Sequence, residues 1–216
     1  LGWPARLGAL IHPQGLHSPA AAEWSGLERA RALGVSVPDP VAAGERIGPW
    51  GELQSFLMVA ELSGCQALNE ALPALASALD PAAFDSLKRE LTAEMAQMTA
   101  RLHGAYLFHK DLYLCHFFLD LTPAARPGKR LSLIDLHRLS RHPFQAVGWR
   151  NKDMGELLYS TLTLQEITDR DRLRFWMHYK RNVRMALPRF QLFLIRLKGR
   201  FYRWHNQGRF ESSLKT

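Results

Sequence analysis

HKDLYLCHFFLD at residues 109–120 and LSLIDLH at residues 131–137 are the two stretches that decide the fold. Both contain short apolar runs beside turn signals, a pattern typical of buried strands. The sequence TPAARPGK at residues 122–129 lies between them and indicates a hairpin-type loop. We therefore expect a polar loop around Asp111 to lead into one strand, and a second strand to deliver Asp135 to the same end of a small sheet.

Two carboxylates at one sheet end suit phosphoryl transfer. One aspartate accepts or orients the proton of the acceptor hydroxyl, and the other holds Mg²⁺ on the nucleotide phosphates. Protein kinases carry these residues in H-R-D-L-x-x-x-x-N and D-F-G motifs. The first motif is similar to HKDL at residues 109–112, and Asp135 lies where the second would begin. His116 stands five residues after Asp111, where protein kinases have Asn, and this argues against a protein kinase.

Each of these residues also has a structural interpretation. A histidine near a strand is more often structural than a ligand, and an aspartate that ends a strand is often only a turn residue. The two motifs in this order, separated by strand, loop and strand, favour function over structure. They do so for Asp111 and Asp135 ahead of His116.

The form that contains His116 resembles the lipopolysaccharide kinase (Kdo/WaaP, InaA-like) family, whose members carry K/R-D-x-Y-x-x-H-F and I-D-L-H-R segments. KDLYLCHF at residues 110–117 and IDLHR at residues 134–138 match both. The resemblance covers most of residues 18–165. It implies an α+β, protein-kinase-like fold, with a partial N-terminal lobe of helix and strands at residues 1–62. A mostly helical C-terminal lobe would follow at residues 63–216, with the catalytic loop and basic C-terminal helices.

The resemblance also implies an activity. It is the transfer of the γ-phosphate of ATP, with Mg²⁺, to a hydroxyl of heptose or Kdo in the lipopolysaccharide inner core. The reaction would take place in the cytoplasm of a Gram-negative cell, at the inner membrane, with no nucleic-acid partner. Asp111 would be the base or orienting residue, and Asp135 would hold the metal. The role of His116 stays open, because imidazole suits Mg²⁺ less well than an amide oxygen.

The nucleotide side of the site is implied by the same resemblance. In the family a helical glutamate pairs with the nucleotide-binding lysine, and Glu23 matches that position. Glu28 is the second choice, with a solvated carboxylate as the preferred interpretation. The apolar run at residues 53–62 resembles the last strand before a hinge, so Glu61 and Leu62 are candidates for binding adenine through their backbone. A plain core strand is the alternative.

Helical periodicity and capping signals outline the rest of the chain. Ser18-Pro19 opens the first helix and Gly34 closes it, while Asp80-Pro81 opens a long one. The resemblance implies that Asp153 ties the catalytic loop from below; the structural interpretation is a helix N-cap, and the two roles are compatible. Helices are predicted at residues 20–33, 81–103, 169–185 and 189–205. Residues 69–78 suggest a short helix or a loop, and residues 149–160 resemble the next helix of the family.

The family pattern is incomplete at the N-terminal end. No lysine precedes Lys88, and nothing in residues 1–17 resembles a loop that covers phosphates. The chain also begins with Leu1 rather than Met, so we expect it to be part of a longer protein. The alternative is a pseudokinase.

Charge is distributed unevenly along the 216 residues. Residues 1–100 carry 6 Lys and Arg against 11 Asp and Glu, a net charge of −5, whereas residues 101–216 carry 22 against 9, a net charge of +13. A basic half suits an anionic partner, namely nucleic acid, an acidic membrane surface or a phosphorylated glycolipid, and composition does not choose among them. We expect no transmembrane helix and no disulfide framework, since apolar runs are short and there are two cysteines.

Two alternatives come from other classes of function. Residues 170–209 interleave basic and aromatic side chains, as single-strand nucleic-acid binding requires, although an ordinary amphipathic helix shows the same pattern. Metal-dependent chemistry at Cys65, His109, Cys115 and His116 is the least favoured, because zinc-type cysteine spacing is absent.

Overall fold

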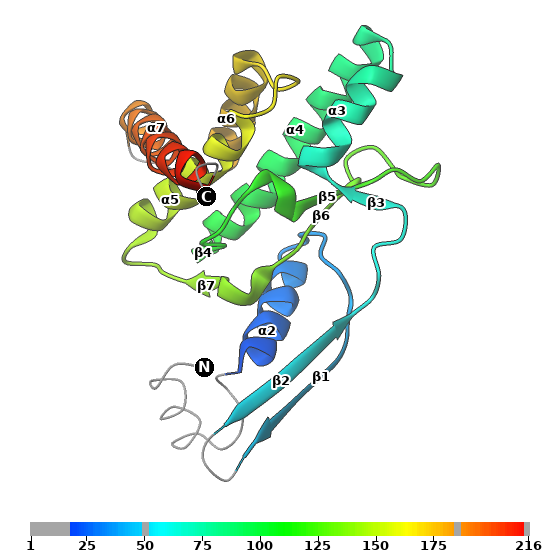
Figure 1. The fold of residues 1–216 in the computed structure, drawn as a ribbon, viewed down its shortest axis with the longest axis vertical. Coiled ribbons are helices and arrows are strands. Elements are labelled where there is room, and N and C mark those ends of the chain that lie inside the picture. The colour runs from blue at the N-terminus through cyan, green and yellow to red at the C-terminus, as the bar shows by residue number, and fades with distance from the viewer. Residues whose placement is uncertain (1–17, 49–51, 184–186, 214–216) are drawn as a thin grey trace.

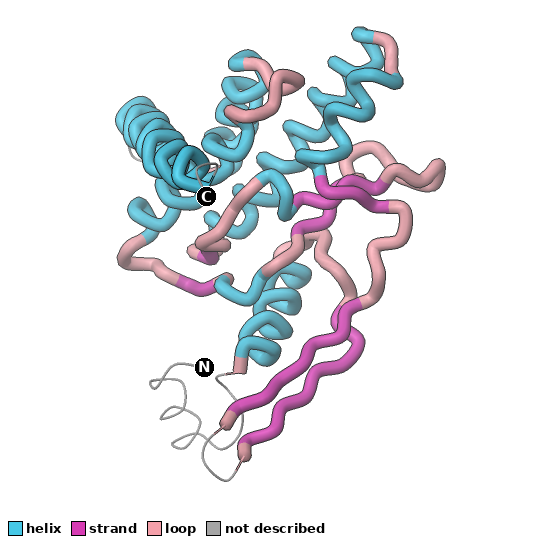
Figure 2. Tube along the Cα trace, in the orientation of Figure 1, coloured by secondary structure: helices cyan, strands magenta, loops and turns pink. Residues whose placement is uncertain are grey.

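A computed structural model describes residues 18–48, 52–183 and 187–213 of the protein. The expectations for residues 1–17 lie outside these ranges. Helix α2 (Pro19–Ala32) and a hairpin of strands β1 (Pro40–Ile47) and β2 (Leu53–Val59) lie together on one side, and α3 to α7 form the other (Figure 1). Small antiparallel sheets connect the two parts (Figure 2).

Helix α2 begins and ends where its capping residues predict. The Ser18 hydroxyl accepts a hydrogen bond from the Ala21 N–H at 3.0 Å, and Gly34 follows the helix with φ of +70°. Gly26 faces the backbone of Leu136, where a Cβ atom would lie 2.6 Å from the carbonyl oxygen. Glycine therefore lets α2 lie directly against the segment that follows Asp135.

The central sheet contains the predicted hairpin. Strands β5 (Phe117–Asp120) and β6 (Leu131–Leu133) pair antiparallel, with Phe117 opposite Leu133, and β3 (Cys65–Ala67) pairs on the other edge of β5. Alternate side chains of β5 and β6 are buried. A second pair, β4 (Leu107–Phe108) and β7 (Ser140–Arg141), lies before and after this hairpin in the chain. A short 3₁₀ turn, η1 (Leu114–His116), leads into β5, and a second, η2 (Leu136–Arg138), follows β6.

Five helices form the larger of the two parts of the molecule. Asp80 caps α4 by accepting the N–H groups of Ala82 and Ala83, each at 3.0 Å. Thr168 and Asp171 cap α6 reciprocally. The helices are α3 (Leu68–Ala78), α4 (Pro81–Gly104), α5 (Ala146–Thr161), α6 (Asp169–Asn182) and α7 (Pro188–Ser213). Each predicted helix is present, although α6 ends earlier and α7 continues past residue 205.

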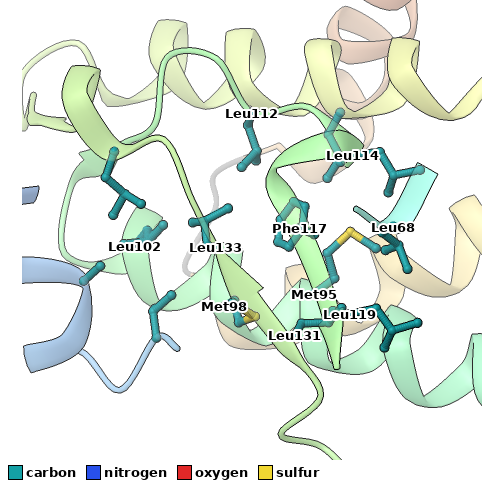
Figure 3. Close-up of a cluster of buried hydrophobic side chains, with 14 of the residues drawn as sticks. Leu68, Met95, Met98, Leu102, Leu112, Leu114, Phe117, Leu119, Leu131 and Leu133 are labelled. Carbon is teal, nitrogen blue, oxygen red and sulfur yellow. The ribbon is translucent and has the colours of Figure 1, made fainter. Parts of the chain in front are cut away.

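The main core lies between α4 and the central sheet (Figure 3). The predicted apolar stripe of α4 supplies Leu91, Met95, Met98 and Leu102 to it. Leu112 and Leu114 are 1% and 0% exposed, so the polar loop before β5 is anchored by two leucines, each contributing ~1.5–3 kcal/mol. This anchoring fixes the backbone that carries Asp111.

The division of the chain at residue 62 stays a prediction. Helix α2 packs on η2 as well as on the β1–β2 hairpin. The Leu133 N–H of β6 also donates to the Ser36 carbonyl at 2.8 Å. The N-terminal elements are therefore tied directly to the segment around Asp135.

Candidate active site

Two site residues adopt a left-handed backbone that side chains other than glycine rarely take. Lys110 has φ of +71° and Asp135 has φ of +62°. Such conformations destabilise the backbone by ~1–2 kcal/mol each and cluster at functional sites. Aspartate tolerates this region better than most residues. The surrounding contacts must therefore hold the loop and the end of β6 in place.

Asp153 of α5 holds the loop from below. Its carboxylate is fully buried and accepts the backbone N–H groups of His109 and Lys110, both at 2.8 Å. Helix α5 begins at Ala146, so Asp153 lies well inside the helix. The alternative role of N-cap is therefore wrong, and the tie to the loop backbone is present.

A buried chain of side chains extends this support to α6. His103 places Nε2 3.1 Å from the Asp153 carboxylate and Nδ1 2.6 Å from the Tyr179 hydroxyl. A carboxylate only accepts, so Nε2 of His103 carries a proton, and in the neutral ring Nδ1 then accepts a hydrogen bond from the Tyr179 hydroxyl. Burial raises the pKa of Tyr179 and so keeps that hydroxyl protonated. Three helices thereby converge beneath the loop.

Asp111 lies on the solvent side of the same loop. Arg138 Nη1 lies 2.6 Å from its carboxylate, and Lys152 Nζ lies 3.7 Å away. Lys152 also binds Glu156 at 2.5 Å and the carbonyl of Lys110. These two cations neutralise the Asp111 carboxylate and fix its orientation.

His116 connects Asp111 with Asp135. Its Nδ1 lies 2.8 Å from the Asp111 carbonyl oxygen, which only accepts, so Nδ1 carries a proton. Its Nε2 then faces the Asp135 carboxylate at 3.5 Å. His116 therefore contacts both the backbone of Asp111 and the carboxylate of Asp135.

His109 is a buried structural residue. Its Nε2 donates to the Ile134 carbonyl at 3.1 Å, and its ring stacks on that of His116, with centroids 5.5 Å apart. Nδ1 is buried and has no hydrogen-bond partner among the described residues. Burial lowers the pKa of His109, which fits a neutral ring.

Lys110 lies over the ring of Trp149. Its Nζ lies 4.6 Å from the ring centroid of Trp149. Partial burial and then the charge of Arg138 lower the pKa of Lys110. The cation–π contact favours a structural role for this side chain.

A cavity of about 400 Å³ lies next to the strand-end carboxylate. Glu23, Glu61, Leu62 and Asp135 all line it, so the structure brings the predicted nucleotide-side and metal residues together. Burial and then the charge of Asp135 raise the pKa of Glu23. Within the described residues no lysine or arginine forms an ion pair with Glu23. Glu28 is exposed, as its solvated interpretation predicts.

Two residues of the site, Arg138 and Lys152, were not predicted from the sequence. Arg138 lies in the IDLHR motif, which predicts no role for it, and Lys152 precedes Asp153 in a helix whose register the sequence leaves open. The motif position is the one signal that could have pointed to Arg138. Both contacts are tertiary, and their spacing along the chain does not reveal them.

Metal chemistry based on cysteine finds no support. Cys65 and Cys115 are free thiols, and burial raises the pKa of both, which disfavours the thiolate that binds metal. Among the described residues, no three or more His, Cys, Asp or Glu side chains gather as a metal site. A lone carboxylate such as Asp135 suits Mg²⁺ that is bound largely through nucleotide phosphates.

The helix-and-hairpin part, the helical part and the loop held from below by a buried aspartate define the protein-kinase-like class. A solved structure of WaaP in complex with acyl carrier protein agrees, with a TM-score of 0.67 and 32% sequence identity over 84% of this chain and 74% of that one. The lipopolysaccharide kinase (Kdo/WaaP) family model matches residues 12–179. The chain belongs to this family.

Two curated relatives share the similarity. Lipopolysaccharide core heptose(I) kinase WaaP from Pseudomonas aeruginosa is 35% identical over 163 residues, which is 75% of this chain and 59% of that protein. The protein of the same name from Escherichia coli K12 is 31% identical over 159 residues, which is 73% of this chain and 58% of that protein. The chain thus spans about three-fifths of the length of these relatives.

Proposed function

We propose that the protein transfers the γ-phosphoryl group of ATP to a hydroxyl of a heptose in the lipopolysaccharide inner core. The observation that carries the proposal is His116, whose ring spans from the Asp111 backbone to the Asp135 carboxylate. It links Asp111, the proposed acceptor residue, to Asp135, the proposed metal ligand. The similarity to proteins named heptose(I) kinases favours heptose over Kdo.

Asp111 is the residue that receives the acceptor. Its carboxylate is 22% exposed and fixed by Arg138, so it can accept a hydrogen bond from a sugar hydroxyl without losing its orientation. As the phosphoryl group leaves ATP, Asp111 orients that hydroxyl and takes its proton. Arg138 and Lys152 limit the build-up of negative charge beside it.

Asp135 and the adjoining cavity form the nucleotide side. The Asp135 carboxylate is a hard oxygen donor, and it would hold Mg²⁺ that is bound to the nucleotide phosphates. Mg²⁺ held there neutralises charge on the transferring phosphates. Glu61 and Leu62 line the same cavity and offer backbone groups to adenine.

Glu23 is proposed to pair with a basic group that the described residues do not supply. The raised pKa of this carboxyl reflects burial beside Asp135, and a cation from a lysine or a bound nucleotide–metal complex would relieve both effects. No lysine precedes Lys88 in the sequence. We propose that the family's lysine strand lies outside this sequence. A pseudokinase that binds nucleotide without transfer is the alternative.

Asp135→Ala tests the metal site. Mg²⁺ with ATP should raise the melting temperature of the wild-type protein, and Asp135→Ala should abolish that Mg²⁺-dependent shift. Asp120→Ala is the matched control, because Asp120 also ends a strand but lies outside the site. A shift that survives in Asp135→Ala would remove this residue from the metal site.

A second binding function is suggested by an apolar cavity of about 650 Å³ among the helices. We propose that the chain, like the solved relative, binds acyl carrier protein, with the cavity taking the acyl chain. Met95, Met154 and Ile195 line the interior, and Arg172 and Arg196 add positive charge. Acylated carrier protein should bind at least tenfold more tightly than the unacylated form, measured by titration calorimetry. Equal affinities of the acylated and unacylated forms would show that the cavity does not bind the acyl chain.

We also propose that the protein works at the cytoplasmic face of the inner membrane. Lipopolysaccharide is lipid-anchored, so its kinase must reach a membrane surface. In the described ranges, none of the helices has both the length and the apolar character needed to cross a membrane. Contact with an anionic surface through the basic C-terminal half would place the site near its acceptor.

A further inference from the structure

One face of helix α7 is apolar and open to solvent. Phe190, Phe193, Leu197 and Phe201 are each 55–59% exposed. At 100° per residue they fall within about 80° of arc along the helix. Leu187, which immediately precedes the helix, is 71% exposed and adds to this apolar surface. We call these five residues the α7 stripe.

The opposite face of α7 packs on α5. Gln191 and Ile195 are 4% and 3% exposed, and Gly199 lies against Leu158, where a Cβ atom would be 3.1 Å from the leucine side chain. Helix α7 lies at the edge of the molecule in Figure 1. Packing inside the chain therefore uses one side of the helix and leaves the stripe outward.

Basic side chains occupy the sector between the buried face and the stripe. Arg189, Arg196 and Arg200 fall within about 40° of one another on the helix and are all exposed. Lys198 flanks the stripe on the other side, with its stem packed against Gly155. A stripe of large apolar side chains bordered by cations is the pattern of a helix that lies in a membrane interface.

The separation of the two kinds of side chain argues against nucleic acid. Single-strand binding needs aromatic rings interleaved with basic groups and open to stacked bases. Two aromatics of α6, Trp176 and Tyr179, are 6% and 0% exposed. On α7 the apolar and basic residues occupy different sectors, and Leu197 offers no ring. The charges beside the stripe would also repel a second copy of α7.

We infer that the α7 stripe inserts into the surface of an anionic lipid bilayer, with the helix parallel to the membrane plane. The inference rests on the proposed function in that it gives a lipid-anchored acceptor a docking surface. The binding itself depends only on α7. It can therefore be measured without any transfer reaction.

Co-sedimentation with phosphatidylglycerol-containing vesicles and with pure phosphatidylcholine vesicles tests the stripe. Phe190→Ser/Phe193→Ser should weaken binding to anionic vesicles about tenfold or more, because two half-exposed rings no longer enter the interface. Phe144→Ser/Val147→Ser is the matched control, since these side chains are 100% and 50% exposed outside α7. Melting temperatures show that both variants fold.

The basic sector has its own test. Arg189→Gln should weaken binding to anionic vesicles and leave the weaker binding to phosphatidylcholine unchanged. The loss of binding to anionic vesicles caused by Arg189→Gln should shrink in high salt. Equal losses in the stripe and control variants, or no loss in either, would overturn the inference. So would a dimer in sedimentation velocity that Phe190→Ser/Phe193→Ser dissociates without changing vesicle binding. Failure of phosphoryl transfer with vesicle binding intact would contradict only the proposed kinase.

Discussion

The two sides of the 109–116 loop differ in how their polar groups are satisfied. Beneath it, the Asp153 carboxylate is 0% exposed and accepts hydrogen bonds from two backbone N–H groups and from His103. Above it, the Asp111 and Asp135 carboxylates are 22% and 37% exposed and contact charged or titratable side chains. The lower side therefore stabilises the loop, and the upper side leaves two carboxylates accessible for chemistry. Substitutions on the lower side should therefore reduce stability more than activity, and substitutions on the upper side should reduce activity more than stability.

Asp153→Ala should have the largest effect on stability. It leaves two buried N–H groups and the His103 ring without their acceptor, each worth ~1–3 kcal/mol. We expect the free energy of unfolding to fall by about 3–5 kcal/mol in urea titrations. Asp169→Ala is the matched control, because that side chain is 98% exposed, and it should cost about 1 kcal/mol or less. Equal losses would contradict a special role for the buried network.

Tyr179→Phe probes the far end of the same network. It removes the hydroxyl that donates to His103 Nδ1 and should cost about 1–2 kcal/mol. Tyr106→Phe should change the free energy of unfolding by about 0.5 kcal/mol or less, since Tyr106 is 42% exposed. If Tyr179→Phe were as mild as its control, α6 would not support the loop.

His109→Gln should give a smaller effect that depends on pH. Burial lowers the pKa of His109, so the unfolded chain binds its proton more readily than the folded one. This group therefore contributes a loss of stability as the pH falls through about 6.5, and nothing well above it. Glutamine can still donate to the Ile134 carbonyl but does not titrate. Chemical denaturation at several pH values should show a flatter acid limb in the variant, and parallel curves would refute the assignment.

Local signals predicted much of this fold. Ser18 and Asp80 cap helices because the residues that they bind are two or three positions away, and the β5–β6 hairpin follows from two apolar runs around a turn sequence. The resemblance to the family placed Glu23 and Asp153 near the site. Arg138 at Asp111 and Tyr179 at His103 are 27 and 76 residues from their partners. Such contacts depend on how helices pack, which no local pattern specifies.

Asp111→Asn separates chemistry from stability most directly. Asparagine keeps the size and a hydrogen-bonding oxygen but lacks the charge and the basic site, and Arg138, 49% exposed, loses only a partly solvated partner. The measurement, made on the full-length protein that includes the lysine strand, is phosphate transfer from radiolabelled ATP to purified inner-core lipopolysaccharide, with the melting temperature and ATP affinity as controls. We predict a fall in kcat of about 10²–10⁴-fold, while the stability stays within about 1 kcal/mol of wild type. A variant that folds, binds ATP and transfers phosphate at the wild-type rate would contradict the assignment of this loop as the catalytic one.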